Sequence, residues 1–384
     1  MPSIFVDVNP TIIDWVSQYA SNATNSGVLD DLAKWKNGEK RPTFKQVETV
    51  SKAIHIPFGY FFLQSPPVET FPVLQYRTID GLNEGNPSRD LIDTINDMES
   101  VQEWMHDYMI ASGYDRLQFV ASCHNENDKQ AIAKRFREIL GIAPDWYKQT
   151  NAKTEAFKFF RSKFEDIGII VMMSGIVGNN THRSLHIEEF RAFALIDDYA
   201  PLIFINFNDS QGAKLFSLIH EAVHILLGTS NFYNDRYGIA DNVSVFETLC
   251  NAVAAEILVP SDYFEKEWSA LATRKLEIKI QQLAETFNCG MVVIARKALD
   301  NHYISRNQYR RIVDDAMEKF RDSQKKGTGG NYYSTMATRI DARFIIALDN
   351  SVKEGKTLFT DAYRLTNTTR KTFSNLTEGV RGIS

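Results

Sequence analysis

The feature that most constrains this chain is an H-E-x-x-H motif, in which His220, Glu221 and His224 lie on a stretch with helical apolar periodicity. Two histidines four residues apart project from one face of a helix, one turn apart, so both imidazoles can bind a single zinc ion. Because zinc lowers the pKa of a bound water to about 7, a nearby carboxylate can take its proton while the water attacks a carbonyl carbon. The motif therefore predicts a zinc-dependent hydrolase with Glu221 as its general base.

A catalytic zinc needs a third protein ligand and an open position. The apolar stretch that follows the motif offers two glutamates, Glu247 and Glu256. On one helix they are about 900° apart at 100° per residue, so they point to opposite sides and cannot both bind the metal. Glu247 shares a helix face with Asn251, whose amide could hydrogen-bond a metal-bound histidine, whereas the neighbours of Glu256 suggest an ion pair at the helix end. We therefore predict a zinc ion bound by His220, His224 and Glu247.

Other candidate sites are weaker. Cys250 lies among apolar residues, which favours a buried core thiol over a nucleophile. His182 and His186 are also four apart, but their stretch lacks an apolar helical face, so we expect no second metal site there. His182 or Arg191 could face a substrate, although ordinary polar roles are favoured. The glycines at 327–330 are not followed by Gly-Lys-Ser/Thr, which excludes a phosphate loop.

The composition fits a globular protein with a hydrophobic core, since 43% of the 384 residues are hydrophobic and 24% are charged. No run approaches the ~20 apolar residues that a membrane span requires, and the N-terminus lacks the basic start and apolar run of a signal peptide. Three scattered cysteines argue against a disulfide framework and against a cysteine-only metal site. Together these features predict a cytoplasmic protein that does not associate with membranes.

The order of patterns along the chain predicts four parts and an α+β fold that is mainly helical. Residues 1–70 read as short helices with tight turns, a small domain of helix-turn-helix type. Residues 71–150 form a helical connecting region that includes a long helix at 88–113. Residues 151–304 combine helices with short apolar runs and hold the candidate metal site. Residues 305–384 form a small C-terminal domain.

Three apolar runs, at residues 169–173, 190–196 and 202–205, are typical of strands, and the short turn between the last two predicts an antiparallel pair. Arg191 interrupts the run at 190–196, and an inward charge of this kind is typical of edge strands. We therefore expect this strand to lie at a sheet edge beside the metal cleft. There it would take an extended peptide substrate by strand addition.

The charge is distributed unevenly. Residues 271–384 carry 20 Lys and Arg against 12 Asp and Glu, whereas residues 1–270 carry 23 against 36. The favoured interpretation is that the basic part complements the acidic remainder of the same molecule. Residues 1–70 carry six basic and seven acidic residues, a balance too acidic for a phosphate-binding face, so we expect weak or absent sequence-specific DNA binding.

Two stretches resemble a known family: residues 216–228, FSLIHEAVHILLG, and residues 247–260, ETLCNAVAAEILVP. They are similar to the ImmA/IrrE metallo-endopeptidases, relatives of the zincins with a glutamate third ligand. In that family's pattern the third ligand stands four residues before the asparagine of the Cys-Asn pair, a position that falls on Glu247. The resemblance implies a zincin-like core with a small sheet containing an antiparallel pair, and endopeptidase activity on a protein, such as a repressor-like transcriptional regulator or an antitoxin-like partner.

The N-terminal stretch at 32–43, LAKWKNGEKRPT, is similar to the end of a Cro/repressor-type (XRE) helix-turn-helix. In proteins that fuse the two parts, segments like 71–78 and 329–335 also occur. Residues 21–27 depart from the pattern, since they are polar and contain glycine where a repressor has its turn. A non-catalytic DNA- or protein-binding regulator, such as a toxin–antitoxin component with an idle metal site, is the alternative to an enzyme. An intact Glu221 favours the enzyme.

Overall fold

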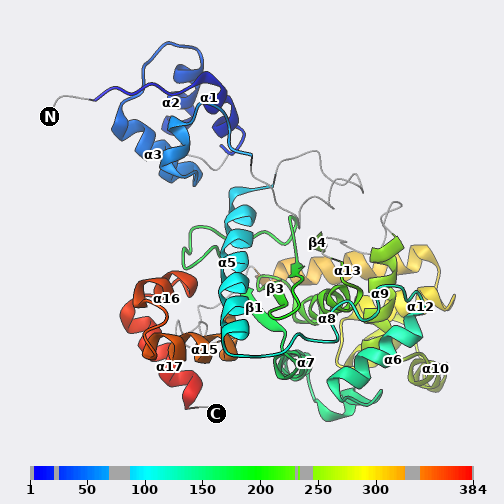
Figure 1. Cartoon of the computed structure of the whole chain (residues 1–384). Helices are drawn as coiled ribbons and strands as arrows, with labels where there is room; N and C mark the ends of the chain where they lie inside the picture. Colours follow the sequence, from blue (N-terminus) through cyan, green and yellow to red (C-terminus); the bar gives the residue numbers. More distant parts are fainter. Residues whose placement is uncertain are drawn as a thin grey trace. The chain divides into compact units, whose positions relative to one another are not determined.

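A computed structural model describes residues 4–20, 26–68, 87–229, 232–233, 245–324 and 338–382 (Figure 1). The chain divides into two compact units, Met1–Phe71 with Asn83–Ile95 and Pro72–Leu82 with Asn96–Ser384. Helices predominate and a small mixed sheet lies in the second unit, so the fold is α+β, as the sequence predicted. No helix within the described ranges is long and apolar enough to cross a membrane. The finer division into four parts stays a prediction.

The first unit is a cluster of short helices whose starts are set by side-chain caps. Asn9 accepts a hydrogen bond from the Thr11 backbone N–H at the start of one helix, and Thr43 and Gln46 form a capping box at the start of another. Apolar side chains from these helices meet in one core. The elements are α1 (Pro10–Ser17), α2 (Ser26–Lys36), α3 (Phe44–Ile54), the 3-10 helix η1 (Phe58–Phe62) and the beginning of α5 (Arg89–Ala111).

The helices expected in the first unit are present, but their assignment to the repressor type stays a prediction. Most of the polar segment at 21–27 and all of the segments at 71–78 and 329–335 lie outside the described residues. The same holds for the glycines at 327–330.

The sheet of the second unit has the strand order β1-β3-β2-β4. β1 pairs with β3 in parallel, whereas β2 is antiparallel to both β3 and β4. The three strands predicted from the sequence are therefore present, and the antiparallel pairing of the second and third is confirmed. The strands are β1 (Ile170–Ser174), β2 (Ala192–Leu195), β3 (Leu202–Asn206) and β4 (Phe232–Tyr233).

The prediction that residues 190–196 form an edge strand is wrong. β2 has neighbours on both sides, since Ala192 and Phe193 pair with β4 while the whole strand pairs with β3. All four residues of β2 are buried. The second neighbour is a two-residue strand, too short to leave a periodic signal in the sequence. Because β4 already pairs with Ala192 and Phe193, an extended peptide cannot add to β2 at these residues.

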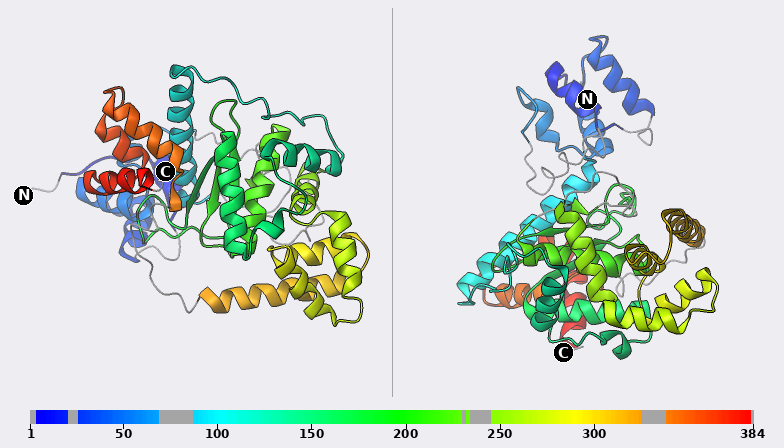
Figure 2. Two further views of the ribbon diagram at one scale, coloured as in Figure 1. Left: turned by 90° about the horizontal axis from the view of Figure 1, so that it is seen from below. Right: turned by 90° about the vertical axis from the view of Figure 1, so that its right-hand side faces the viewer.

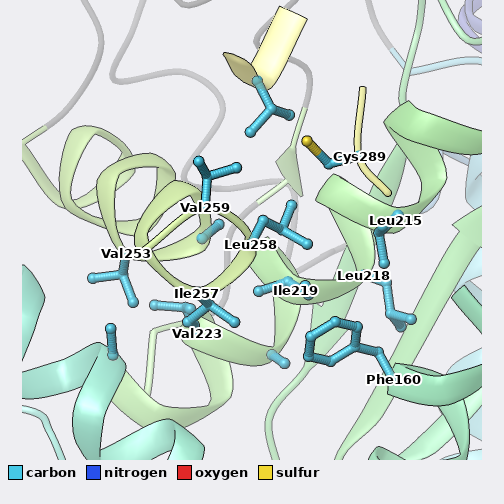
Figure 3. Close-up of a cluster of buried hydrophobic side chains, with 14 of the residues drawn as sticks. Phe160, Leu215, Leu218, Ile219, Val223, Val253, Ile257, Leu258, Val259 and Cys289 are labelled. Atoms are coloured by element: carbon cyan, nitrogen blue, oxygen red, sulfur yellow. The ribbon is translucent and has the colours of Figure 1, made fainter. Parts of the chain in front are cut away.

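Helices α7 (Lys153–Ile167) and α8 (Gln211–Leu227) pack against the sheet and against each other, and α9 (Val245–Leu258) lies beside α8 (Figure 2). Apolar residues from several of these helices interlock in one cluster, which includes Phe160, Leu218 and Ile257 (Figure 3). Each fully buried side chain of this kind contributes roughly 1.5–3 kcal/mol to stability. The cluster thus holds α8 and α9 in a fixed relation, with the candidate site between them.

The remaining helices of the second unit surround this centre. They are α6 (Lys129–Leu140), the 3-10 helix η3 (Trp146–Gln149), α10 (Ser261–Ala270), α11 (Leu276–Thr286), α12 (Met291–Asp300), α13 (Arg306–Gln324), α15 (Ala342–Lys353), α16 (Phe359–Leu365) and α17 (Arg370–Arg381).

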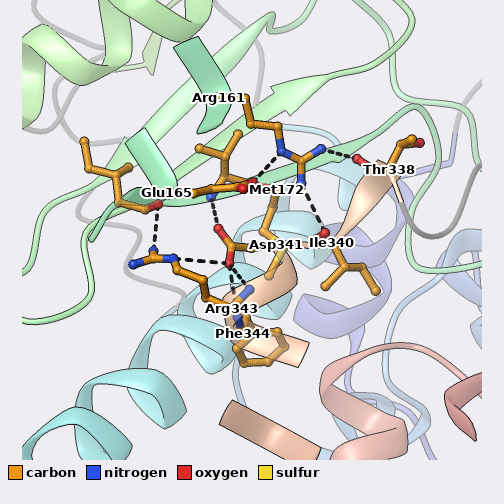
Figure 4. A network of polar contacts seen from close by, with 10 residues as sticks. Arg161, Glu165, Met172, Thr338, Ile340, Asp341, Arg343 and Phe344 are labelled. Carbon is orange, nitrogen blue, oxygen red and sulfur yellow. Dashed lines mark hydrogen bonds and ion pairs between the residues drawn. The ribbon is translucent and has the colours of Figure 1, made fainter. Parts of the chain in front are cut away.

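The C-terminal helices are attached to the outer edge of β1 by a polar network (Figure 4). Asp341 caps α15 with one carboxylate oxygen and accepts the Val171 backbone N–H, at 3.1 Å, with the other. Arg161 of α7 donates to the backbone carbonyls of Val171 and Ile340 at 3.2 and 3.1 Å, and Arg343 donates to that of Ile169 at 3.0 Å. These side chains satisfy backbone groups of an edge strand that would otherwise be open to pairing.

Candidate metal centre

The three residues of the motif lie on α8, whose two ends are well defined. At its start, Ser210 accepts the Ala213 backbone N–H, at 3.3 Å. It ends at Gly228, whose φ of +70° is left-handed. A Cβ atom at Gly228 would lie 2.6 Å from the Cβ of Ala121, so the position needs glycine for space as well as for conformation.

His220, His224 and Glu247 bring three potential ligand atoms to one point. The Nε2 atoms of the two histidines are 3.1 Å apart. Each lies 3.1 Å from a different carboxylate oxygen of Glu247, which the first turn of α9 supplies. In the described parts of the chain, no other three His, Cys, Asp or Glu side chains come close enough to hold a metal ion.

This arrangement fits a zinc ion. Two ligand atoms at about 2.0–2.1 Å from a tetrahedral zinc lie roughly 3.3 Å apart, close to the 3.1 Å separations found here. Two imidazoles and one carboxylate also form a known ligand set of catalytic zinc sites, which leaves a fourth position for water or substrate.

The electrostatics of the site favour a bound cation. Burial opposes ionisation of Glu247, but His220 and hydrogen bonds to both histidines hold the pKa of this carboxyl far below its usual range. Burial raises the pKa of Glu221 to about 8. His224 opposes this rise, and the negative charge of Glu247 adds to it. Two carboxyl groups are therefore buried near each other, and a divalent cation held by His220, His224 and Glu247 would stabilise the charged form of both.

Glu221 is completely buried. Neither of its carboxylate oxygens has a hydrogen-bond partner among the described residues. Buried carboxylates without partners are rare because each lost hydrogen bond leaves a desolvation cost uncompensated. The Glu221 carboxylate is thus available to a water or to a substrate group.

His224 is held in place from the side that faces away from Glu247. Its Nδ1 atom lies 3.2 Å from the Thr229 hydroxyl and 3.7 Å from the Cys250 sulfur. If Nε2 binds the metal, Nδ1 carries the ring proton and donates a hydrogen bond to the Thr229 hydroxyl. This bond fixes the orientation of the imidazole ring. Sequence reasoning missed Thr229, because only the chain reversal at Gly228 brings it back to the histidine.

Cys250 is a buried thiol, as expected from its apolar neighbours. Burial raises the pKa of the thiol despite the opposing effect of His224, so the sulfur is kept protonated and is a poor nucleophile.

Glu256 lies at the other end of α9 and takes part in an ion pair, as its neighbours suggested. It pairs with Lys297 and accepts hydrogen bonds from the backbone N–H and hydroxyl of Ser261 at 3.0 and 2.7 Å. Its carboxylate is therefore occupied away from the metal centre. The hydrogen bond predicted from Asn251 to a metal-bound histidine stays a prediction.

The other polar residues singled out in the sequence do not join the centre. His182 and His186 lie in the segment between β1 and β2 and are not part of the metal-binding group found in the described residues. Arg191 is buried and forms an ion pair with Asp209.

Comparison with known proteins agrees with the geometry. Residues 165–299 match the model of peptidase family M78, described as an IrrE N-terminal-like domain. The matched segment contains the whole sheet and all four residues proposed for the site. Residues 340–379, which span most of the C-terminal helices, match a domain of unknown function, DUF8813. A search of curated proteins found no match. The first match supports the resemblance to the ImmA/IrrE family and indicates a metallopeptidase-type function.

Proposed function

We propose that this protein is a zinc-dependent endopeptidase in which His220, His224 and Glu247 hold the metal. The observation that carries the proposal is the convergence of their ligand atoms at 3.1 Å separations beside a buried carboxylate, Glu221, that has no partner in the described residues. When bound, zinc would polarise a peptide carbonyl and lower the pKa of a coordinated water to about 7.

Glu221 is the proposed general base. Its carboxylate would accept the proton of the attacking water and deliver it to the nitrogen of the departing amine. Because Glu221 is fully buried, the proton has few competing acceptors. Thr229 would hold the His224 ring through Nδ1, so that Nε2 stays directed at the metal position.

The proposed substrate is a protein, such as a repressor-like transcriptional regulator or an antitoxin-like partner. The resemblance of residues 216–228 and 247–260 to the ImmA/IrrE metallo-endopeptidases motivates this choice of substrate. We place the protein in the cytoplasm, where such regulators act.

The N-terminal unit is proposed to contact proteins rather than DNA. Five of the six basic side chains on and beside α2 and α3 are paired with carboxylates, which reduces the positive potential available to phosphates. The pairs are Lys34–Asp30, Lys36–Asp14, Lys40–Asp31, Arg41–Asp7 and Lys52–Glu48. A discrete, salt-sensitive gel shift by this protein, lost when residues 1–70 are removed, would contradict this proposal.

The test compares purified full-length protein with the Glu221→Gln variant, using metal analysis and digestion of a peptide library and of candidate regulator proteins. We expect about one zinc per chain in both proteins and cleavage by the wild type alone. Glu256→Gln is the control, since it removes a buried carboxylate of the adjacent helix α9 outside the centre and should retain zinc. Full zinc content without cleavage of any peptide or protein would instead favour the non-catalytic regulator.

A further inference from the structure

Helix α8 carries a buried polar strip that extends beyond the metal centre. At 100° per residue, Lys214, Ser217, His220, Glu221 and His224 fall within an arc of about 120° on the helix. None of the five exposes more than 4% of its surface. The remaining buried positions of α8 are apolar. Burying polar groups is costly unless hydrogen bonds, ion pairs or a ligand satisfy them, and the metal centre accounts for only three of them.

Lys214 lies at the end of the strip farthest from His224. Its ammonium group donates one hydrogen bond, to the backbone carbonyl of Phe207 at 3.2 Å, and lies 4.0 Å from the centre of the Phe207 ring. No carboxylate pairs with it in the described part of the chain. An ammonium has three N–H donors, so two remain for a ligand. Since Phe207 is 37% exposed, the group lies just below the molecular surface.

Lys214, Arg191 and Asp209 form a buried group that carries a net positive charge. Arg191, at the start of β2, pairs with Asp209, which leaves Lys214 as an uncompensated cation next to that pair. The Arg191 Nε atom also has no hydrogen-bond partner among the residues that the structure describes. All three side chains are more than nine-tenths buried. Two buried cations and one buried anion, with N–H donors unused, form a site suited to one further negative charge.

Ser217 connects the two ends of the strip. It is one turn from both Lys214 and Glu221, and its hydroxyl, which is buried, has no partner among the described residues. Glu221, Ser217 and Lys214 thus bring unsatisfied polar groups one after another along one face of α8, and a polar ligand lying along the helix would satisfy them.

We propose that Lys214, with Arg191 beside it, forms a subsite for a carboxylate of the peptide substrate. This inference rests on the proposed peptidase function and specifies its substrate class. Lys214 and Glu221 are seven positions apart, which is about 10.5 Å along the helix axis. A helical side chain also leans toward the N-terminus. The ammonium is therefore about 10–15 Å from the general base. An extended peptide advances about 3.3 Å per residue, so the recognised carboxylate lies about three to five residues from the cleaved bond.

The test selects peptides by binding, which does not depend on cleavage. A random peptide library, with free and amidated C-termini in separate arms, is captured on the zinc-loaded full-length Glu221→Gln protein. We expect enrichment of Asp or Glu at a fixed position. If the enrichment occurs only in the free arm and at the last residue, the carboxylate is the peptide's C-terminus. Replacing the enriched residue by Asn or Gln should weaken binding at least about 10-fold.

The variants Lys214→Met and Lys214→Arg, made in the same Glu221→Gln background, isolate the charge. Methionine keeps most of the stem volume and should abolish the discrimination between acid and amide, whereas arginine should retain it. Lys279→Met is the matched control, because Lys279 is also buried and lies over an aromatic ring, that of Trp268, at 3.8 Å. It should leave the acid preference unchanged. Thermal melting verifies that each variant is folded.

The outcomes separate the two proposals. Absence of an acid preference, or a preference that survives Lys214→Met, overturns the subsite even if wild-type protein cleaves peptides. If the acid preference depends on Lys214 but zinc-loaded wild-type protein cleaves none of the selected peptides, the subsite stands and the peptidase function fails.

Discussion

The two glutamates of α9 are expected to have opposite roles, which a pair of matched substitutions can separate. Glu256→Gln leaves the Lys297 ammonium buried without a counter-charge, because the pair is more than nine-tenths buried and Glu256 is its partner. Breaking such a pair costs about 3–5 kcal/mol. Glu247→Gln instead removes a proposed metal ligand, and we expect zinc content to fall.

The predicted loss for Glu256→Gln corresponds to a fall in melting temperature of roughly 6–15 °C for a domain of this size. Urea unfolding and thermal melting are measured on metal-free protein, so that zinc does not contribute. The double variant Glu256→Gln with Lys297→Met should recover part of the loss, since no buried charge is then left unpaired.

The pH dependence of stability gives a further check on Glu256. Although burial opposes ionisation, Lys297 and Ser261 lower the pKa of this carboxyl below its usual 4.5. A lowered folded-state pKa stabilises the protein above pH 4.5, and this contribution is lost as pH falls through the folded-state value. Glu256→Gln should flatten that part of the stability profile. A Glu256→Gln protein that lost zinc but melted normally, with Glu247→Gln showing the reverse, would refute the assignment.

Three further substitutions test the supports of the site and of the fold. Thr229→Val removes the acceptor for His224 Nδ1 and should weaken zinc affinity about 10- to 100-fold, as measured by chelator competition; unchanged affinity would show that the hydroxyl is not needed. Gly228→Ala forces a left-handed residue against Ala121 and should cost at least about 1–2 kcal/mol in urea unfolding, whereas wild-type stability would contradict the close approach. Asp341→Ala removes the cap of α15 and the acceptor for an N–H of β1; we expect a loss of about 1–3 kcal/mol, and a neutral result would show that the network in Figure 4 does not attach the C-terminal helices.

The candidate metal ligands could be recognised in the sequence because the helical spacings that relate them are local. A spacing of four on one helix fixes the relation of His220 to His224, and the opposite directions of Glu247 and Glu256 follow from the same periodicity. The structure brings Glu247 to both histidines and places Glu256 with Lys297. The strands were likewise recognisable as short apolar runs bounded by turns.

The features that the sequence did not reveal depend on contacts between distant segments. β4 is only two residues long, so its pairing with Ala192 and Phe193 could not be expected, and the edge position of β2 was wrongly predicted. The unpaired ammonium of Lys214 is recognisable only once Arg191 is seen to occupy Asp209. Such relations arise from tertiary packing and leave no periodic signal.

The ligand set of the metal is tested most directly by X-ray absorption of the zinc-loaded full-length protein. The account predicts a first shell of nitrogen and oxygen atoms at about 2.0–2.2 Å, with an imidazole signal that corresponds to two histidines. The spectrum should be the same for Glu221→Gln, whereas Glu247→Ala should retain too little zinc to give this spectrum. Because the Cys250 sulfur lies only 3.7 Å from His224, a sulfur ligand at about 2.3 Å is the specific alternative. A sulfur in the first shell, or a shell unchanged by Glu247→Ala, would contradict the proposed centre.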